Sequence, residues 1–157
     1  MLEVAWPMKT IVIVGGGRNV GKTTLARRLC EFLPESVVVK LGHHPPKPGR
    51  PSHYFMIGTP FGEIASQLPE GKFLIVESGS VLDEPAFEPD LIIFLPTGDS
   101  AIGDKPGSAR RRARAHVVRG ETLTERRAGE LAHRLGIGHE TFHRLLKTVN
   151  SVHGSLD

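Results

Sequence analysis

Short apolar runs recur along the chain, each bounded by polar residues or glycine. The four strongest are KTIVIV (9–14), SVVVKLG (36–42), KFLIVES (72–78) and DLIIFLP (90–96), and a weaker run, AHVVRG, follows at 115–120. β-Branched residues are frequent in them, and the apolar positions are nearly continuous rather than alternating. This pattern is typical of strands that are buried on both faces, as in parallel sheets. We therefore predict a mostly parallel sheet built from these runs.

Apolar residues recur at helical spacing between and after the strands. KTTLARRLCEFL (22–33) predicts a first helix, and a weak short helix is predicted at 62–69. Thr122 to Glu125 form a capping-box pattern that predicts the start of another helix, and HETFHRLLKTV (139–149) predicts the last. The segments 43–55 and 97–114 are rich in proline, glycine and polar residues, which predicts loops.

Strands separated by helices or long crossovers predict an α/β fold with helices on both faces of the sheet. The prediction is a single domain over residues 1–157, with an N-terminal arm at 1–7 and a C-terminal helical pair at 121–150. A chain of 157 residues is long enough for one domain with a substantial core.

Composition and charge indicate the class of ligand and the expected location of the protein. The net charge is +3, and part of the excess lies in RRRAR (110–114) rather than along a face, which favours an anionic ligand over a nucleic-acid surface. Cys30 is the single cysteine, so no disulfide can form within the chain and a cytoplasmic location is expected. No apolar stretch reaches membrane-spanning length, so no membrane association is expected.

The stretch GGGRNVGKTT (15–24) lies between the first predicted strand and the first predicted helix. It matches the pattern G-x-x-x-x-G-K-[ST] of the phosphate-binding P-loop. Glycines let backbone N–H groups approach a polyphosphate, the helix N-terminus adds a positive dipole end, and the lysine supplies a cation. The predicted nucleotide-binding residues are Gly16, Gly17, Asn19, Val20, Gly21, Lys22, Thr23 and Thr24. We therefore predict a P-loop NTPase that binds a purine nucleotide, GTP or ATP, with Mg²⁺.

A carboxylate, Glu77, ends the third strong apolar run. In P-loop proteins a carboxylate at this strand end meets Mg²⁺ or its water shell. We predict that the Thr23 hydroxyl and Glu77 form the metal site, and that Lys22 and Glu77 are catalytic. The chain has no N-K-x-D stretch, the guanine-reading pattern of GTPases, so the sequence leaves the choice of base open.

Basic residues at two further places complete the predicted site. His43 is predicted to be catalytic, because a histidine at this edge of the sheet can bind phosphate or orient a water molecule. Arginines in the 97–114 segment are predicted to form a lid that neutralises charge near the γ-phosphate. The predicted substrate or lid residues are Lys40, His44, Arg110, Arg111 and Arg112.

Four segments together resemble the molybdopterin-guanine dinucleotide biosynthesis protein B family: VGGGRNVGKTTLARRL (14–29), VVVKLGHHP (37–45), FLIVES (73–78) and DLIIFL (90–95). That family similarly combines a P-loop, a strand ending in lysine and histidines, and a strand ending in glutamate. The resemblance spans about the first hundred residues. It implies a homodimeric nucleotide-binding accessory protein that works with a molybdenum-cofactor biosynthesis partner protein. The family usually has an acidic stretch after its histidines, whereas PPKPGRPSHYF (45–55) is proline-rich and basic.

Two other functions fit the same sequence. A small-molecule kinase would use the same P-loop, with RRRAR as its lid and the 43–55 segment as its acceptor site. A nucleotide-regulated DNA-binding protein is the second alternative, because AGELAHRLGIGHETFHRLL (128–146) resembles a helix-turn-helix whose second helix would read DNA. Of the three functions we favour the accessory protein with slow NTP hydrolysis, and we expect no nucleic-acid partner.

Overall fold

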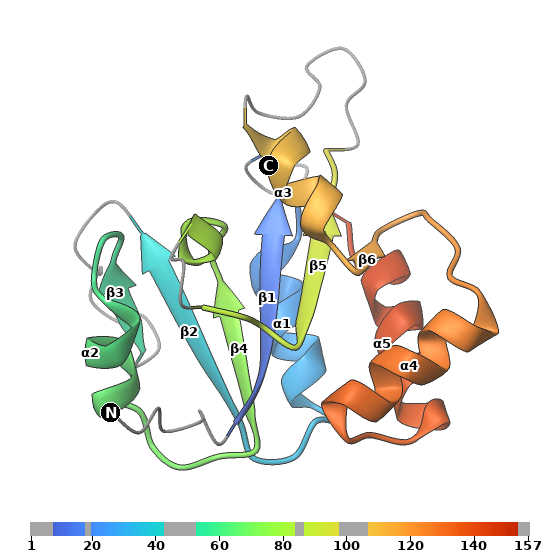
Figure 1. Cartoon of the computed structure of the whole chain (residues 1–157), viewed down its shortest axis with the longest axis horizontal. Coiled ribbons are helices and arrows are strands. Elements are labelled where there is room, and N and C mark those ends of the chain that lie inside the picture. The colour runs from blue at the N-terminus through green and yellow to red at the C-terminus, as the bar shows by residue number, and fades with distance from the viewer. Residues whose placement is uncertain (1–7, 18–19, 43–52, 84–86, 98–106, 154–157) are drawn as a thin grey trace.

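A computed structural model describes residues 8–17, 20–42, 53–83, 87–97 and 107–153 (Figure 1). Strands, helices and one 3₁₀ helix (η1) alternate along the chain. They are β1 (Lys9–Gly15), α1 (Lys22–Cys30), β2 (Ser36–Gly42), β3 (Tyr54–Met56), α2 (Phe61–Ser66), β4 (Phe73–Glu77), η1 (Ser80–Asp83), β5 (Leu91–Leu95), α3 (Ser108–Arg114), β6 (Val117–Val118), α4 (Glu125–Leu135) and α5 (His139–Ser151).

The described strands form one sheet in the order β3-β2-β4-β1-β5-β6, and every neighbouring pair is parallel. The arrowheads in Figure 1 therefore point towards a common end, where α3 lies. Parallel neighbours cannot be joined by tight hairpins, so helices or longer segments carry the chain back between strands. The predicted α/β fold with a parallel sheet is confirmed.

Side chains of the central strand alternate between two cores. Ile11 and Ile13 of β1 pack in one core with residues of α1, α4 and α5. Val12 and Val14 pack in the second core, with Ile64 of α2 and residues of η1. Every residue of β4 and β5 is buried, as expected for strands covered on both sides. The predicted helices on both faces and the predicted C-terminal helical pair are confirmed.

The connections of β1 and β4 leave the sheet on opposite faces. β1 leads through α1 to β2, passing β4, and α1 belongs to the first core. β4 leads through η1 to β5, passing β1, and η1 belongs to the second core. Adjacent strands with diverging connections leave a crevice at their carboxyl ends, where ligands bind in open α/β sheets. The fold thus places the start of α1, which follows β1, and Glu77 at the end of β4 at the same edge of the sheet.

Several predicted element boundaries were wrong. The segment 97–114 was predicted to be a loop, but Ser108–Arg114 forms α3, because arginine and alanine are good helix formers once the glycines and proline end at Gly107. The segment 43–55 was predicted to lack regular structure, but its end joins β3 at the sheet edge. The capping residue of α4 is Thr124 rather than Thr122, and its side chain accepts a hydrogen bond from the Arg127 N–H at 3.1 Å.

His116, which directly precedes β6, is hydrogen-bonded to Ile92 of β5 through its ring and its backbone. The Nδ1 atom of its ring accepts a hydrogen bond from the Ile92 N–H at 2.9 Å, and its own backbone N–H donates to the Ile92 carbonyl at 2.9 Å. Burial lowers the pKa of His116, and the nearby positive charges of Arg134 and Arg127 lower it further. The hydrogen bond accepted by Nδ1 and the lowered pKa both favour the neutral form of the ring.

Candidate functional site

The glycine-rich loop, residues 15–21, folds back tightly on the end of β1; residues 18 and 19 lie outside the described part. The Gly16 N–H donates to the Leu95 carbonyl at 2.9 Å, which ties the loop to the end of β5. A Cβ atom added to Gly15 would lie 2.6 Å from Val20 Cγ2 and 3.2 Å from Lys22 Cδ. A side chain at residue 15 would therefore collide with Val20, and the stem of Lys22 lies close over the Gly15 backbone.

Gly21 starts α1 in a left-handed conformation, with φ of 100°. Its carbonyl accepts the first helical hydrogen bond, from the Leu25 N–H at 2.8 Å. Glycine has no side chain to cap the helix, and the first turn of α1 carries no acidic residue. The first turn of a helix has N–H groups without intrahelical partners, so this end of α1 suits an anion.

Thr23 on the first turn of α1 and Glu77 at the end of β4 are in direct contact. The Thr23 hydroxyl donates a hydrogen bond to Glu77 Oε1 at 2.8 Å. Glu77 is only 5% exposed, and its register partners are Ile13 on β1 and Lys40 on β2. The structure therefore brings together the two residues that the sequence predicts as a metal site.

The pair fits Mg²⁺ in donor chemistry and in spacing. Mg²⁺ prefers oxygen ligands at about 2.0–2.1 Å in octahedral geometry, so adjacent ligand atoms lie roughly 3 Å apart. The Thr23 and Glu77 oxygens are 2.8 Å apart, close to that spacing. Within the described residues, no three His, Cys, Asp or Glu side chains are grouped so that they could hold a metal ion together. Mg²⁺ keeps several waters in proteins, so two protein oxygens are compatible with it.

The remaining predicted residues of the loop and its surroundings are only partly covered by the described chain. Lys40 is half-buried at the end of β2 and is the register partner of both Glu77 and Tyr54. Thr24 is exposed on the first turn of α1. Asn19, His43 and His44 lie outside the described residues, so their predicted roles stay predictions.

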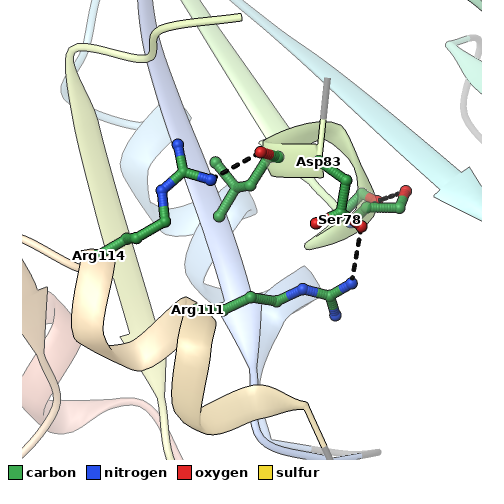
Figure 2. A network of polar contacts seen from close by, with 6 residues as sticks. Ser78, Asp83, Arg111 and Arg114 are labelled. Carbon is green, nitrogen blue, oxygen red and sulfur yellow. Dashed lines mark hydrogen bonds and ion pairs between the residues drawn. The ribbon is translucent and has the colours of Figure 1, made fainter. Parts of the chain in front are cut away.

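The α3 arginines hold the segment that follows Glu77. Figure 2 shows Arg111 and Arg114 reaching from α3 towards η1, where Arg111 pairs with Asp83 at 3.4 Å. Arg114 donates to the Leu82 carbonyl at 2.6 Å. A Cβ on Gly79 would lie 2.7 Å from Arg111 Nη1, so the guanidinium rests on the Gly79 backbone. α3 is therefore packed against the segment that directly follows β4.

The three predicted lid arginines lie on different sides of α3. Arg110 is exposed, whereas Arg112 pairs with Glu121 at 3.4 Å and has its guanidinium carbon 5.7 Å from the centre of the Phe94 ring. Together with the Arg111–Asp83 pair, these contacts occupy two of the three arginines in the structure described here. Their action on a phosphate stays a prediction.

Arg119, just after β6, is a site residue that the sequence does not reveal. Its guanidinium donates to the Val20 carbonyl at 2.7 Å, to the Val152 carbonyl at 2.8 Å and to the Pro96 carbonyl. Burial lowers the pKa of Arg119. One side chain thus joins the glycine-rich loop, the end of β5 and the end of α5. No local motif marks it, because its three partners are far apart in sequence.

The end of α5 also forms a wall of the loop. A Cβ on Gly21 would lie 2.4 Å from Val152 Cγ1 and 3.1 Å from the His153 carbonyl oxygen. Only glycine allows this approach, and its φ of 100° favours glycine for a second reason. The last helix is therefore part of the candidate site and not an appendage to it.

A cavity of about 530 Å³ opens beside this wall. We call it the β6–α4 cavity, because most of its lining comes from the segment that joins these elements and from the facing side of α5. Pro96 and Thr97, at the end of β5, complete it.

In the described residues no helix is both long and apolar enough to cross a membrane.

Neither a protein-family model nor a curated protein matches this chain.

Proposed function

We propose that the chain binds a purine nucleoside triphosphate with Mg²⁺ at the glycine-rich loop and slowly hydrolyses its terminal phosphate. The observation that carries the proposal is the 2.8 Å hydrogen bond between Thr23 and Glu77. It unites the first turn of α1 with the end of β4, beside the lysine that lies over Gly15. A threonine hydroxyl, a strand-end carboxylate and a lysine around one anion-binding helix end are the parts that phosphoryl chemistry needs.

Each residue has a defined role in this proposal. The backbone N–H groups at the start of α1 bind phosphate oxygens, and the Lys22 ammonium neutralises charge between the terminal phosphates. Thr23 and Glu77 would hold Mg²⁺ directly or through its waters, and the ion would supply further charge neutralisation on the phosphates. Glu77 is buried and directed at this region, so it is also placed to orient an attacking water. Nearly all of the catalysis is then positioning and electrostatics.

The biological setting that we propose is molybdopterin guanine dinucleotide biosynthesis, in which the chain serves as an accessory protein. The support is the resemblance in sequence, and the element Lys40-His43-His44 is what narrows it to this family. Lys40, the one of these three residues that the structure describes, is the register partner of Glu77. The partner protein and the homodimer that the resemblance implies belong to the same proposal.

The test of nucleotide binding is calorimetry with Mg·ATP and Mg·GTP on the chain and on Lys22→Ala. A hydrogen bond to a charged group contributes about 1.5–3 kcal/mol, so affinity should fall by about 10- to 150-fold. Lys72→Ala is the matched control. Lys72 is exposed, and its ammonium group lies 3.4 Å from Glu35, which is not a residue of the candidate site. Equal affinity of Lys22→Ala and the parent chain would refute the proposal, as would binding of neither nucleotide.

The accessory role has its own test. In a reconstituted attachment of a nucleotide to molybdopterin, the chain should raise the rate and Lys22→Ala should not. An unchanged rate in the presence of the parent chain would remove this role while leaving nucleotide binding in place.

A further inference from the structure

We infer that the β6–α4 cavity holds the base and ribose of the nucleotide whose phosphates bind at the glycine-rich loop. The inference rests on the proposed function, and it adds the part of the ligand that the loop cannot bind. The sequence carries no motif for the base, so the argument depends on where the cavity lies, how large it is and what lines it.

The sheet order fixes the direction in which the nucleotide lies. β1 carries the loop, β4 on one side carries Glu77, and β5 and β6 lie on the other side. The metal site and Lys40 all belong to the β4 side, which therefore takes the terminal phosphate. The nucleoside must extend the opposite way, over the carboxyl ends of β5 and β6. The cavity lies there, since Thr97 follows β5 and Arg119 follows β6.

The cavity adjoins the loop at two places. A Cβ on Gly17 would lie 2.8 Å from Thr97 Cγ2, and Thr97 lines the cavity. His153 also lines the cavity, and its carbonyl oxygen lies next to Gly21 at the start of α1. The loop and the cavity thus share walls at Thr97 and at the end of α5, and Arg119, which also lines the cavity, donates to the Val20 carbonyl of the loop. The volume of about 530 Å³ is within the usual range for small-molecule sites, roughly 300–1,000 Å³.

The lining suits a flat ring with polar edges. Leu123, Ala128 and Leu146 supply an apolar surface for the faces of a base. Glu121 and Glu125 also line the cavity, where they pair with Arg112 at 3.4 Å and with His143 at 3.3 Å. Each carboxylate has two oxygens, so the one outside the ion pair can accept a hydrogen bond from an N–H group on a base edge. Ligand sites commonly combine an apolar lining with a few polar groups that give specificity. We therefore assign a purine whose edge carries an amino group as the base, and the test below distinguishes adenine from guanine.

Asn150 of α5 also lines the cavity, and it contacts the segment that carries Glu121. Its Oδ1 accepts a hydrogen bond from the Gly120 N–H at 2.9 Å, so its amide NH₂ is the group left for a ligand. The same bond holds the β6–α4 segment against α5. The cavity is therefore shaped by contacts that exist without a nucleotide.

The experiment compares nucleotides with inorganic tripolyphosphate, which has the phosphates but no nucleoside. Leu146→Trp and, on the exposed rim, Thr122→Trp each place a large side chain in the cavity. We expect either variant to weaken binding of Mg·ATP or Mg·GTP at least tenfold and to leave tripolyphosphate binding within twofold. Lys22→Ala should weaken both ligand types. Thr122→Trp keeps the test valid if Leu146→Trp does not fold.

The outcomes separate the inference from the proposed function. If tripolyphosphate and nucleotide bind and neither tryptophan variant changes the ratio of their affinities, the cavity is not the nucleoside site and the proposed function stands. If neither ligand binds the parent chain, the proposed function fails and the inference with it.

The assignment of the base edge is tested on the parent chain and on Glu121→Gln/Glu125→Gln. The double variant should weaken the better-bound natural nucleotide about tenfold. It should not weaken the analogue that lacks the exocyclic amino group, which is ITP for GTP or purine riboside triphosphate for ATP. Equal losses for both members of the pair would overturn the role of the carboxylates.

Discussion

Removing the Arg119 guanidinium tests whether one side chain holds the loop, β5 and α5 together. It donates to three backbone carbonyls, those of Val20, Val152 and Pro96. A hydrogen bond to a charged group contributes about 1.5–3 kcal/mol, so three independent bonds would sum to about 4.5–9 kcal/mol. The side chain is only half-buried, and water can replace part of each bond. We therefore expect Arg119→Ala to lower the free energy of unfolding by about 2–4 kcal/mol.

The assay is urea denaturation followed by circular dichroism, with the denaturant slope compared between variants. Arg126→Ala is the matched control, because Arg126 is 92% exposed and only pairs with Glu130 at 3.5 Å on the same helix. That variant should lose no more than about 0.5 kcal/mol. Arg119→Lys should fall between the two, because an ammonium group cannot reach three carbonyls with a planar fork.

Two results would refute this account of Arg119. One is a loss for Arg119→Ala that equals the loss for Arg126→Ala, which would mean that water serves the three carbonyls equally well. The other is full recovery in Arg119→Lys, which would mean that charge alone matters and not the geometry of the guanidinium.

Three further predictions concern the metal site, the sheet edge and the loop. Glu77→Gln keeps an oxygen for the threonine but loses the charge, so nucleotide affinity by calorimetry should stay within about tenfold, about 1.4 kcal/mol, while phosphate release falls at least about tenfold; unchanged release would exclude Glu77 from the reaction. Burial and nearby arginines lower the pKa of His116, so the contribution of the neutral ring to the free energy of unfolding is complete above about pH 6.5 and falls as the pH drops below it. In urea titrations at several pH values, His116→Asn, which retains an acceptor, should flatten this decline. An equally steep decline in the variant would contradict the assignment. Gly21→Ala should destabilise the chain more than Gly58→Ala. Both glycines have positive φ, but a Cβ at residue 21 would lie 2.4 Å from Val152 Cγ1, whereas a Cβ at residue 58 would have nothing within 4 Å. Equal losses in thermal unfolding would show that the contact with Val152 does not contribute to stability.

The strands and most helices could be predicted from the sequence because their burial dictates their pattern. The run 36–42 matches β2 residue for residue, although only Val37, Val39 and Leu41 in it are buried. β4 and β5 lie within the runs 72–78 and 90–96, and every residue of these two strands is buried. α3 could not be predicted in this way. Its one buried residue is Ser108, so it has no apolar stripe, and its arginines bind neighbouring segments instead.

The candidate site divides in the same manner. The places of Lys22, Thr23 and Glu77 could be predicted, because the sequence pattern puts these residue types at fixed positions relative to a strand and a helix. Their roles in phosphate and metal binding stay predictions. Arg119 could not be predicted, because its role is to donate hydrogen bonds to three carbonyls that the fold brings together from distant segments. A sequence pattern records local spacing, and a side chain that acts only across the tertiary structure leaves no such pattern.

The contact between Gly21 and Val152 sets an order of events during synthesis. A ribosome releases the chain from its N-terminus, at about 5–20 residues per second, so the loop emerges on the order of 10 s before the residue that closes its wall. During that interval β1 and α1 can form, but the surface against which Gly21 packs does not yet exist. Under the proposed function, a nucleotide whose binding needs the complete wall would therefore act only after translation has passed residue 152, and not as a template for folding.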